Sequence, residues 1–101
     1  MRMMMLIQCP PEPFNTRARN GTAGSTMKRI LDDTKPEAAY FSERDGKRGA
    51  VLIVDVQSPS DVPRLAEPWF LCFSAEVEFR ICMLPEELGQ ANLDALGKKW
   101  G

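Results

Sequence analysis

Two short segments of the chain are apolar without the alternation that a half-exposed strand shows. One is Met3-Met4-Met5-Leu6-Ile7 and the other is Val51-Leu52-Ile53-Val54. Such runs predict strands that are covered on both faces and therefore lie in the centre of a sheet. A chain of 101 residues buries only about 60–68% of its unfolded surface, so its own core is thin and a second subunit would help to cover these strands.

Prolines, glycines and helix-capping residues divide the rest of the chain into elements. Gly21 and Gly24 suggest a kink before the first helix, and Pro68 should kink or end the second one. The predicted elements are a strand over Arg2–Cys9, a helix over Thr22–Thr34 after an early turn near Phe14, strands over Glu37–Arg44 and Ala50–Val56 joined by a polar turn over Asp45–Gly49, a helix with Ser60 as N-cap, a strand over Glu76–Met83, and a last helix from Pro85 with Gly97 as its C-cap.

This β-α-β-β-α-β order with an extra C-terminal helix predicts one α+β domain of ferredoxin-like fold over residues 1–101. Right-handed crossovers place both main helices on one face of a four-stranded antiparallel sheet. The strands Arg2–Cys9 and Ala50–Val56 are then central, and the helices cover only one of their faces. We expect a second copy of the chain to cover the other face, so the sequence predicts a homodimer through the sheet.

The segment Leu65-Ala66-Glu67-Pro68-Trp69-Phe70, followed by Glu76-Val77-Glu78-Phe79-Arg80, completes a pattern that resembles the dimeric α/β-barrel superfamily. Within it the chain is similar to small proteins of the muconolactone-isomerase-like kind. The resemblance covers nearly the whole chain and is one of architecture, without a shared catalytic motif. Members include isomerases, cofactor-free monooxygenases, haem enzymes and non-catalytic ligand-binding or regulatory modules, and fold alone does not choose among them.

The chain has no histidine, and this absence narrows the possible chemistry. It removes the commonest general base and the commonest metal and haem ligand, so a His-containing catalytic triad is impossible. The cysteines, Cys9, Cys72 and Cys82, are odd in number and form no CxxC pair. This pattern favours buried free thiols over a disulfide framework or a zinc site. We therefore expect a protein without metal or cofactor.

The charges are mixed along the chain, with 13 basic and 14 acidic residues and a net charge of −1. Nucleic-acid modules usually need a basic footprint to neutralise phosphates. The segment Ala50–Val56 also lacks the aromatic and basic residues that an RNA-recognition module presents on its third strand. The apolar run at the N-terminus stops at Gln8, too early for an export signal or a membrane span. We expect a cytoplasmic protein that binds neither nucleic acid nor membranes.

The strand Glu76–Met83 is the one segment with clean alternation between apolar and polar residues. Packing favours the apolar set toward the helices, which places Glu78 and Arg80 in the cleft between the two sheets of a dimer. There the carboxylate can act as a base, and the guanidinium can hold an anion. The alternative is a solvated edge strand whose charges discourage aggregation.

Three further features have both a functional and a structural interpretation. Tyr40, which shares a strand face with Ser42, either donates to a substrate oxygen or only places its hydroxyl at the surface. Trp69-Phe70 either lines a ligand mouth or packs in the core. The segment 21–26, Gly-Thr-Ala-Gly-Ser-Thr, sits where a helix N-terminus could cradle a phosphate, but it lacks the lysine of a P-loop. Close packing of a helix at its glycines is favoured instead.

Two functions remain open from the sequence. The first is a non-catalytic small-molecule-binding or interaction dimer, and the absence of histidine and of any sharp motif favours it. The second is a cofactor-free isomerase or monooxygenase-like enzyme acting on a small anionic or aromatic metabolite. In the enzyme, Glu78 would be the base, Arg80 the anion contact and Tyr40 an assisting group. The candidate ligand-binding residues are Arg80, Glu78, Tyr40 and Trp69.

Overall fold

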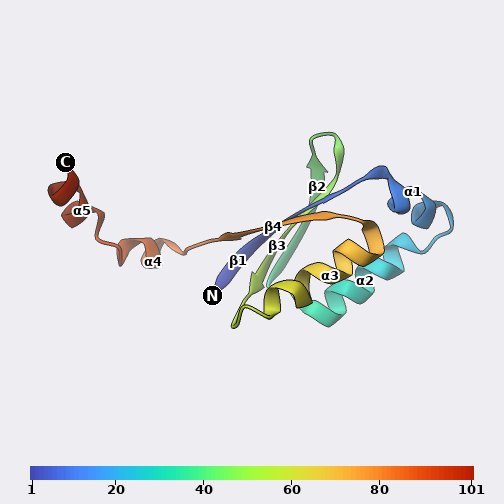
Figure 1. Ribbon diagram of the computed structural model, residues 1–101, viewed down its shortest axis with the longest axis horizontal. Coiled ribbons are helices and arrows are strands. Elements are labelled where there is room, and N and C mark those ends of the chain that lie inside the picture. Colours follow the sequence, from blue (N-terminus) through green and yellow to red (C-terminus); the bar gives the residue numbers. More distant parts are fainter.

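The computed structural model describes residues 1–101 and is shown in Figure 1. Four strands form one sheet, two long helices pack on it, and two short helices follow the last strand. No helix combines the length and the apolar character that crossing a membrane requires. In chain order the elements are β1 (Arg2–Cys9), α1 (Pro11–Arg19), α2 (Ala23–Thr34), β2 (Ala38–Arg44), β3 (Lys47–Asp55), α3 (Asp61–Phe73), β4 (Glu76–Ile81), α4 (Pro85–Gly89) and α5 (Leu93–Trp100).

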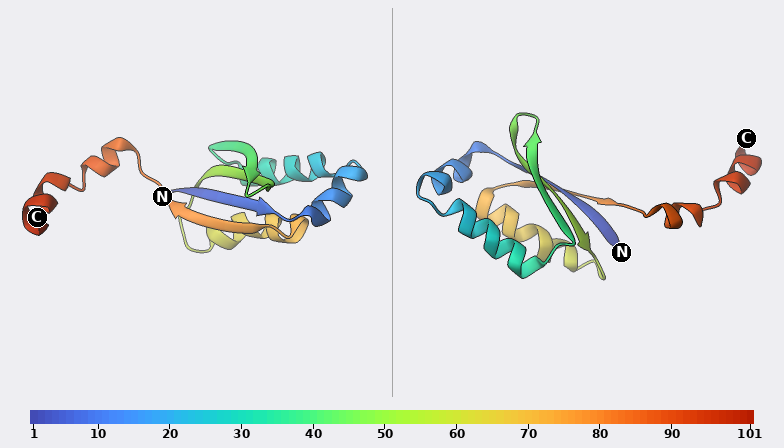
Figure 2. Two further views of the ribbon diagram at one scale, coloured as in Figure 1. Left: turned by 90° about the horizontal axis from the view of Figure 1, so that it is seen from above. Right: turned by 180° about the vertical axis from the view of Figure 1, so that it is seen from behind.

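The strands lie in the order β2-β3-β1-β4, and every neighbouring pair is antiparallel. Helices α2 and α3 lie side by side on one face of the sheet, while the opposite face carries no helix (Figure 2). The predicted α+β ferredoxin-like fold is therefore confirmed, with β1 and β3 as the central strands. Both helices share one side because each connects two parallel strands by a right-handed crossover.

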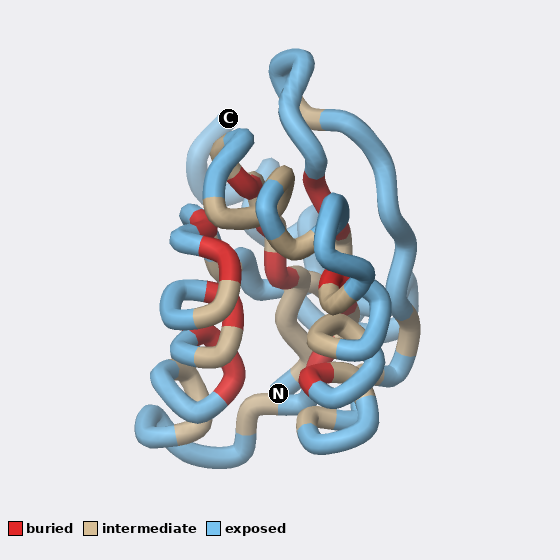
Figure 3. Tube along the Cα trace, turned by 90° about the vertical axis from the view of Figure 1, so that its right-hand side faces the viewer, coloured by how far each residue is buried: buried red, intermediate tan, exposed pale blue.

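The core lies between the helices and one face of the sheet, where the buried residues gather (Figure 3). Trp69 and Phe73 of α3 are 1% and 0% exposed, and their ring centroids are 5.9 Å apart. Phe14 of α1 extends this aromatic cluster, with its ring centroid 4.9 Å from that of Phe73. On the sheet, Met5 pairs with Leu52 and points its side chain into the same core.

The other side of the sheet, which we call the open face, has no cover in the single chain. Register fixes its members, because directly opposed residues of antiparallel strands share a face. Met4, Leu6, Val51 and Ile53 form its apolar centre and stay partly exposed. Residues at its margins are Arg2, Gln8, Ala38, Tyr40, Ser42, Arg44, Glu76, Glu78 and Arg80.

The β2–β3 hairpin turns at Asp45-Gly46, as the sequence predicts, and only the polar turn region around it is shorter than expected. Only Asp45 and Gly46 separate the strands, with positive φ angles of 54° and 76°. Two successive residues of positive φ define the turn that matches strand twist. Because pairing resumes at once, Lys47 and Gly49, predicted as part of an exposed turn, belong to β3 instead.

Helix α3 does not end at Pro68, which was one of the two predicted outcomes, and continues to Phe73. Proline removes one backbone hydrogen bond from a helix and crowds the preceding turn. Here Leu65, Trp69 and Phe73 are buried on both sides of the proline, and their burial offsets that loss. Ser60 is the N-cap residue, as predicted, although its side chain makes no capping hydrogen bond.

Two roles were predicted for the glycines near the start of α2, a kink and close packing, and the structure supports only the kink. A Cβ added at Gly21 or Gly24 would meet no atom within 4 Å, so neither glycine serves close helix packing. Gly21 instead adopts a φ of 81°, which turns the chain between α1 and α2.

The C-terminal segment forms two helices rather than the single predicted one. Asn92 interrupts the helical path with a φ of 53° and caps α5 by accepting a hydrogen bond from the Ala95 amide at 3.2 Å. Gly97, predicted as a C-cap, therefore lies inside α5. Both helices extend away from the sheet, as Figure 1 shows in red.

The aromatic cluster should carry a large share of the stability. We expect Phe73→Ala to lower the free energy of unfolding by about 3–5 kcal/mol, because it empties a fully buried site. The matched control is Leu71→Ala in the same helix, where the side chain is 78% exposed and the change should stay within about 0.5 kcal/mol. Urea denaturation of both variants measures the difference. Equal losses would contradict the assigned core.

Candidate functional site

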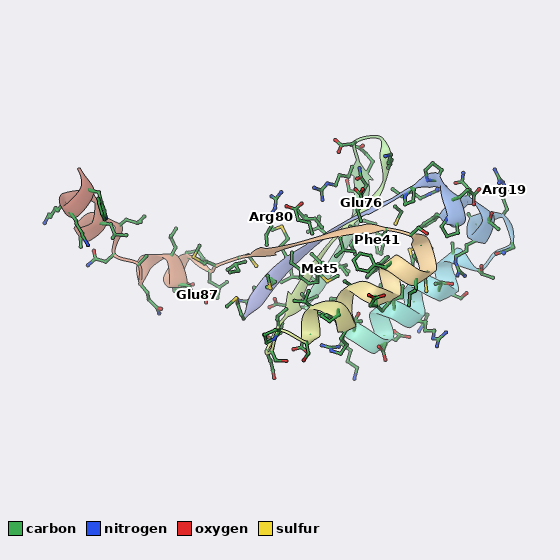
Figure 4. The ribbon with its side chains drawn as sticks, viewed as in Figure 1. Met5, Arg19, Phe41, Glu76, Arg80 and Glu87 are labelled. Carbon is green, nitrogen blue, oxygen red and sulfur yellow. The ribbon has the colours of Figure 1, made fainter.

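The predicted pair of Glu78 and Arg80 forms on the open face of β4. Arg80 Nε donates to Glu78 Oε1 at 3.0 Å, and Arg44 Nη2 donates to Glu78 Oε2 at 3.2 Å. Figure 4 shows Arg80 and Glu76 on the side of the sheet that faces away from α3. These hydrogen bonds, first from Arg80 and then from Arg44, hold the pKa of Glu78 below its ordinary value. The carboxylate is thereby a weaker base than a free one.

Arg44 reaches this carboxylate from the opposite edge of the sheet, which sequence reasoning did not foresee. It ends β2, while Glu78 lies in β4. Gly49 makes room for the crossing, since a Cβ there would lie 3.2 Å from the Cβ of Arg44 and 3.0 Å from a carbonyl oxygen of β1. The main chain is held as well, because Gln8 Nε2 donates to the Arg44 carbonyl at 3.0 Å.

The other two predicted ligand contacts do not join this pair. Tyr40 lies on the open face in the same cross-strand row as Glu78, with Val51 and Leu6 between them. Three strand spacings of about 4.8 Å put it about 14 Å away. Trp69 lies on the opposite side of the sheet, within the core. The single chain thus brings Glu78 and Arg80 together and leaves Tyr40 and Trp69 apart from them.

A pocket of about 500 Å³ lies on the helix side of the sheet, beneath the β2–β3 hairpin. We call it the hairpin pocket. Its rim carries Glu43, Lys47 and Arg48 from the hairpin. Its apolar walls are formed by Ile7, Cys9, Phe14, Met27, Phe41, Ala50 and Trp69.

Arg48 is the principal charged group of the hairpin pocket. Its guanidinium lies 4.3 Å from the centre of the Phe14 ring, and Nη1 donates to Asn15 Oδ1 at 2.7 Å. It forms no ion pair with a carboxylate of the chain. The carboxylate of Glu43 is engaged elsewhere, since Oε2 accepts a hydrogen bond from the Gly46 amide at 2.7 Å. The rim therefore offers a guanidinium that forms no ion pair, with Glu43 directly opposite it in the hairpin.

Cys9 is buried in the wall of the hairpin pocket. Burial raises the pKa of its thiol, although the nearby Arg48 charge works in the opposite direction. The thiol is therefore protonated at neutral pH and is a poor nucleophile. Cys72 and Cys82 are also free and are partly buried.

Sequence reasoning missed the hairpin pocket because its residues come from distant parts of the chain. Two signals pointed toward it. Cys9 has the same parity along β1 as Met5 and Ile7, which places it on the helix face, and Phe41 must face away from Tyr40. Arg48 could not be found in this way, since it was assigned to an exposed turn.

The threonine side chains of the glycine-containing segment at the start of α2 form local hydrogen bonds. The backbone N–H of Thr22 and its hydroxyl both donate to Asn20 Oδ1, at 3.1 and 2.6 Å. The hydroxyl of Thr26 donates to the Thr22 carbonyl at 2.7 Å. The hydroxyls of Thr22 and Thr26 are thus engaged within this turn.

Comparison with known proteins supports the fold. No family model matches the sequence, and no curated protein is similar to it. One similar solved structure is TftG, a 5-chloro-2-hydroxyhydroquinone dehydrochlorinase from Burkholderia phenoliruptrix AC1100, in complex with 2,5-dihydroxybenzoquinone. It superimposes with a TM-score of 0.62 at 15% sequence identity, and the match covers 85% of this chain and 97% of TftG. The de novo designed protein Ferredog-Diesel gives 0.43 at 13% identity over 79% and 83%. The first likeness supports the ferredoxin-like fold of the chain.

The pKa of Glu78 gives a direct test of the open-face ion pairs. In Arg80→Gln the pKa should rise toward the ordinary value of 4.5, and Arg44→Gln should raise it less. Because the folded pKa is the lower one, the stabilisation is present above about pH 4.5 and is lost as the pH falls through the folded pKa. Carboxyl NMR titration checks the order, with Arg19→Gln as a remote control. A pKa that is unchanged in both variants would refute the network.

Proposed function

We propose that the protein is a cytoplasmic homodimer that binds a small aromatic anion in the hairpin pocket without transforming it. The observation that carries the proposal is a pocket with apolar and aromatic walls and an arginine at its rim that forms no ion pair. Ligand sites commonly combine such walls with a few placed polar groups.

The size and lining of the hairpin pocket define the ligand class. A volume of about 500 Å³ falls within the usual range for small-molecule sites. Phe14, Phe41 and Trp69 favour a flat ring between them. Arg48 can hold a carboxylate or an ionised hydroxyl through two parallel hydrogen bonds.

The chemistry of the pocket favours binding over catalysis. Cys9 keeps its proton at neutral pH, so nucleophilic attack by a thiolate is disfavoured. Glu78, the base expected from the sequence, lies on the opposite face of the sheet, and its lowered pKa weakens it further as a base. A bound anion would therefore meet charge and apolar surface, and the carboxylate at the rim, Glu43, already accepts a hydrogen bond from the Gly46 amide.

The alternative is a cofactor-free isomerase or monooxygenase-like enzyme for the same class of ligand. Its support is the structural neighbour TftG, a dehydrochlorinase whose complex holds 2,5-dihydroxybenzoquinone. That molecule is a flat ring with acidic hydroxyl groups, so it matches the ligand class inferred from the walls and rim of the hairpin pocket.

The proposed dimer covers the open face. Met4, Leu6, Val51 and Ile53 would form its centre, and Arg80, Glu78 and Tyr40 would surround them. Two identical faces packed about a two-fold axis are self-complementary, and the packing removes an apolar patch from water.

The ligand proposal is tested by calorimetric titration with 2,5-dihydroxybenzoquinone and with the matched pair 4-hydroxybenzoate and 4-hydroxybenzamide. We expect the two anions to bind and the neutral amide to bind more weakly. Arg48→Ala should weaken binding of the anions about tenfold or more, because a charge-assisted hydrogen bond is lost. Arg48→Lys should lose less.

Arg19→Ala is the control, since Arg19 is exposed and lies outside the hairpin pocket. Binding that survives Arg48→Ala unchanged, or a preference for the neutral amide, would overturn the site. Conversion of 2,5-dihydroxybenzoquinone or of either matched ligand, followed by absorbance and mass spectrometry, would favour the enzyme.

The dimer is tested by sedimentation velocity at micromolar concentration. The species should have about twice the chain mass of 11.3 kDa. Val51→Lys should produce a monomer, because it places an unpaired charge in the centre of the interface. Ser58→Lys, which adds the same charge to an exposed loop, should remain dimeric. A wild-type monomer at this concentration would contradict the proposed interface.

A further inference from the structure

The last twenty residues, 82–101, form an arm that leaves the domain. Figures 1 and 2 show α4 and α5 projecting beyond the end of the sheet, and Figure 4 places Glu87 far from the helix layer. Every residue from Met83 to Gly101 is exposed. Two contacts with Arg2 tie the start of the arm to the domain, a backbone hydrogen bond from Cys82 and an ion pair of 3.8 Å with Glu87.

The arm has an apolar side that nothing in the chain covers. In α5, Leu93, Leu96 and Trp100 are spaced by three and four residues and therefore share one face of the helix. Trp100 is 77% exposed. Leu84 and Leu88 continue the apolar surface toward the sheet. Helices of five and eight residues are too short to be stable alone in water, so the arm needs a surface to pack on.

The overall dimensions show how much surface the chain leaves uncovered. Its radius of gyration is 17.0 Å, against about 13 Å for a compact domain of this length. Its accessible surface is 6919 Å², against about 5,700 Å² for a compact monomer of this mass. The excess of roughly 1,200 Å² per chain is what a stable dimer interface buries on each partner.

We propose that the arm of each chain docks on a second copy of the same chain, so that the dimer is held by reciprocal exchange of arms. The inference rests on the proposed homodimer and adds to it the element that completes the interface. Exchange of identical elements about a two-fold axis closes the assembly at two chains. It also covers both apolar surfaces without another kind of protein.

The start of the arm adjoins the proposed interface. The Cys82 amide donates to the Arg2 carbonyl at 3.4 Å, which continues the pairing of β4 with β1 for one more residue. Arg2 itself is a margin residue of the open face. An arm that begins at this margin continues directly from the sheet interface onto the second copy.

The charges on the arm favour an apolar contact with protein over a membrane surface. Glu86, Glu87 and Asp94 slightly outnumber Lys98 and Lys99. Helices that bind at membrane interfaces usually carry an excess of basic residues opposite the apolar side. A contact held mainly by apolar burial should be insensitive to salt.

The two tryptophans provide a native readout for the full chain. Trp69 is buried in the core, so quenching by iodide reports on Trp100 in the arm. At a concentration where sedimentation shows the dimer, Trp100 should be several-fold less quenched than free tryptophan. Dilution into the monomer range should restore its quenching.

A matched pair of variants separates docking of the arm from its mere presence. Leu96→Asp puts a charge on the apolar side of α5 and should weaken dimerisation about tenfold or more. Ala95→Asp puts the same charge on the opposite side of the same helix and should leave dimerisation and Trp100 protection unchanged.

The outcomes distinguish failure of the arm from failure of the dimer. A dimer whose Trp100 is freely quenched would overturn arm exchange and leave the sheet interface standing. A monomer with exposed Trp100 would overturn both proposals. Protection of Trp100 in a monomer, or only after addition of anionic vesicles, would overturn exchange in favour of the arm's own domain or of a membrane.

Discussion

The packing of α3 onto the sheet through Trp69 and Phe73 is the contact on which the rest of the molecule depends. These rings fill the space above β1 and β3, and Phe14 closes the same cluster from α1. Their burial offsets the backbone hydrogen bond that Pro68 removes, so α3 continues past this proline. Phe14 and Trp69 belong both to this cluster and to the walls of the hairpin pocket. The pocket therefore lies at the edge of the aromatic cluster.

The sequence was sufficient for the fold because its strongest signals are local or periodic. The alternation in β4 and the unbroken apolar runs in β1 and β3 predicted which strands are central, and the structure agrees. The errors arose where tertiary packing overrides local preference. Pro68 does not end its helix, because burial on both sides outweighs the lost hydrogen bond. Asn92 divides the last helix by adopting a positive φ that no periodicity reveals.

The candidate site was predicted less completely, for a related reason. Alternation alone was enough to pair Glu78 with Arg80, since residues two apart on a strand share a face. The third member, Arg44, arrives from the far edge of the sheet, and only the strand order reveals that approach. The hairpin pocket depends on a two-residue turn that moves Arg48 from an expected loop into a strand. The sequence alone shows which side chains share one face of a strand or helix. Contacts between different elements can be found only when the strand order and register are known.

The β2–β3 hairpin contributes to both surfaces of the sheet. On the helix side it supplies Arg48 to the hairpin pocket, and on the open face it supplies Arg44 to the carboxylate of Glu78. Gly49 has no side chain, so β3 can lie close to β1 and to Arg44 of β2 at this point. A ligand that holds the hairpin in one position would therefore also fix one margin of the open face. Occupancy of the pocket and affinity between subunits would then be thermodynamically linked, and each equilibrium would shift the other by the same factor.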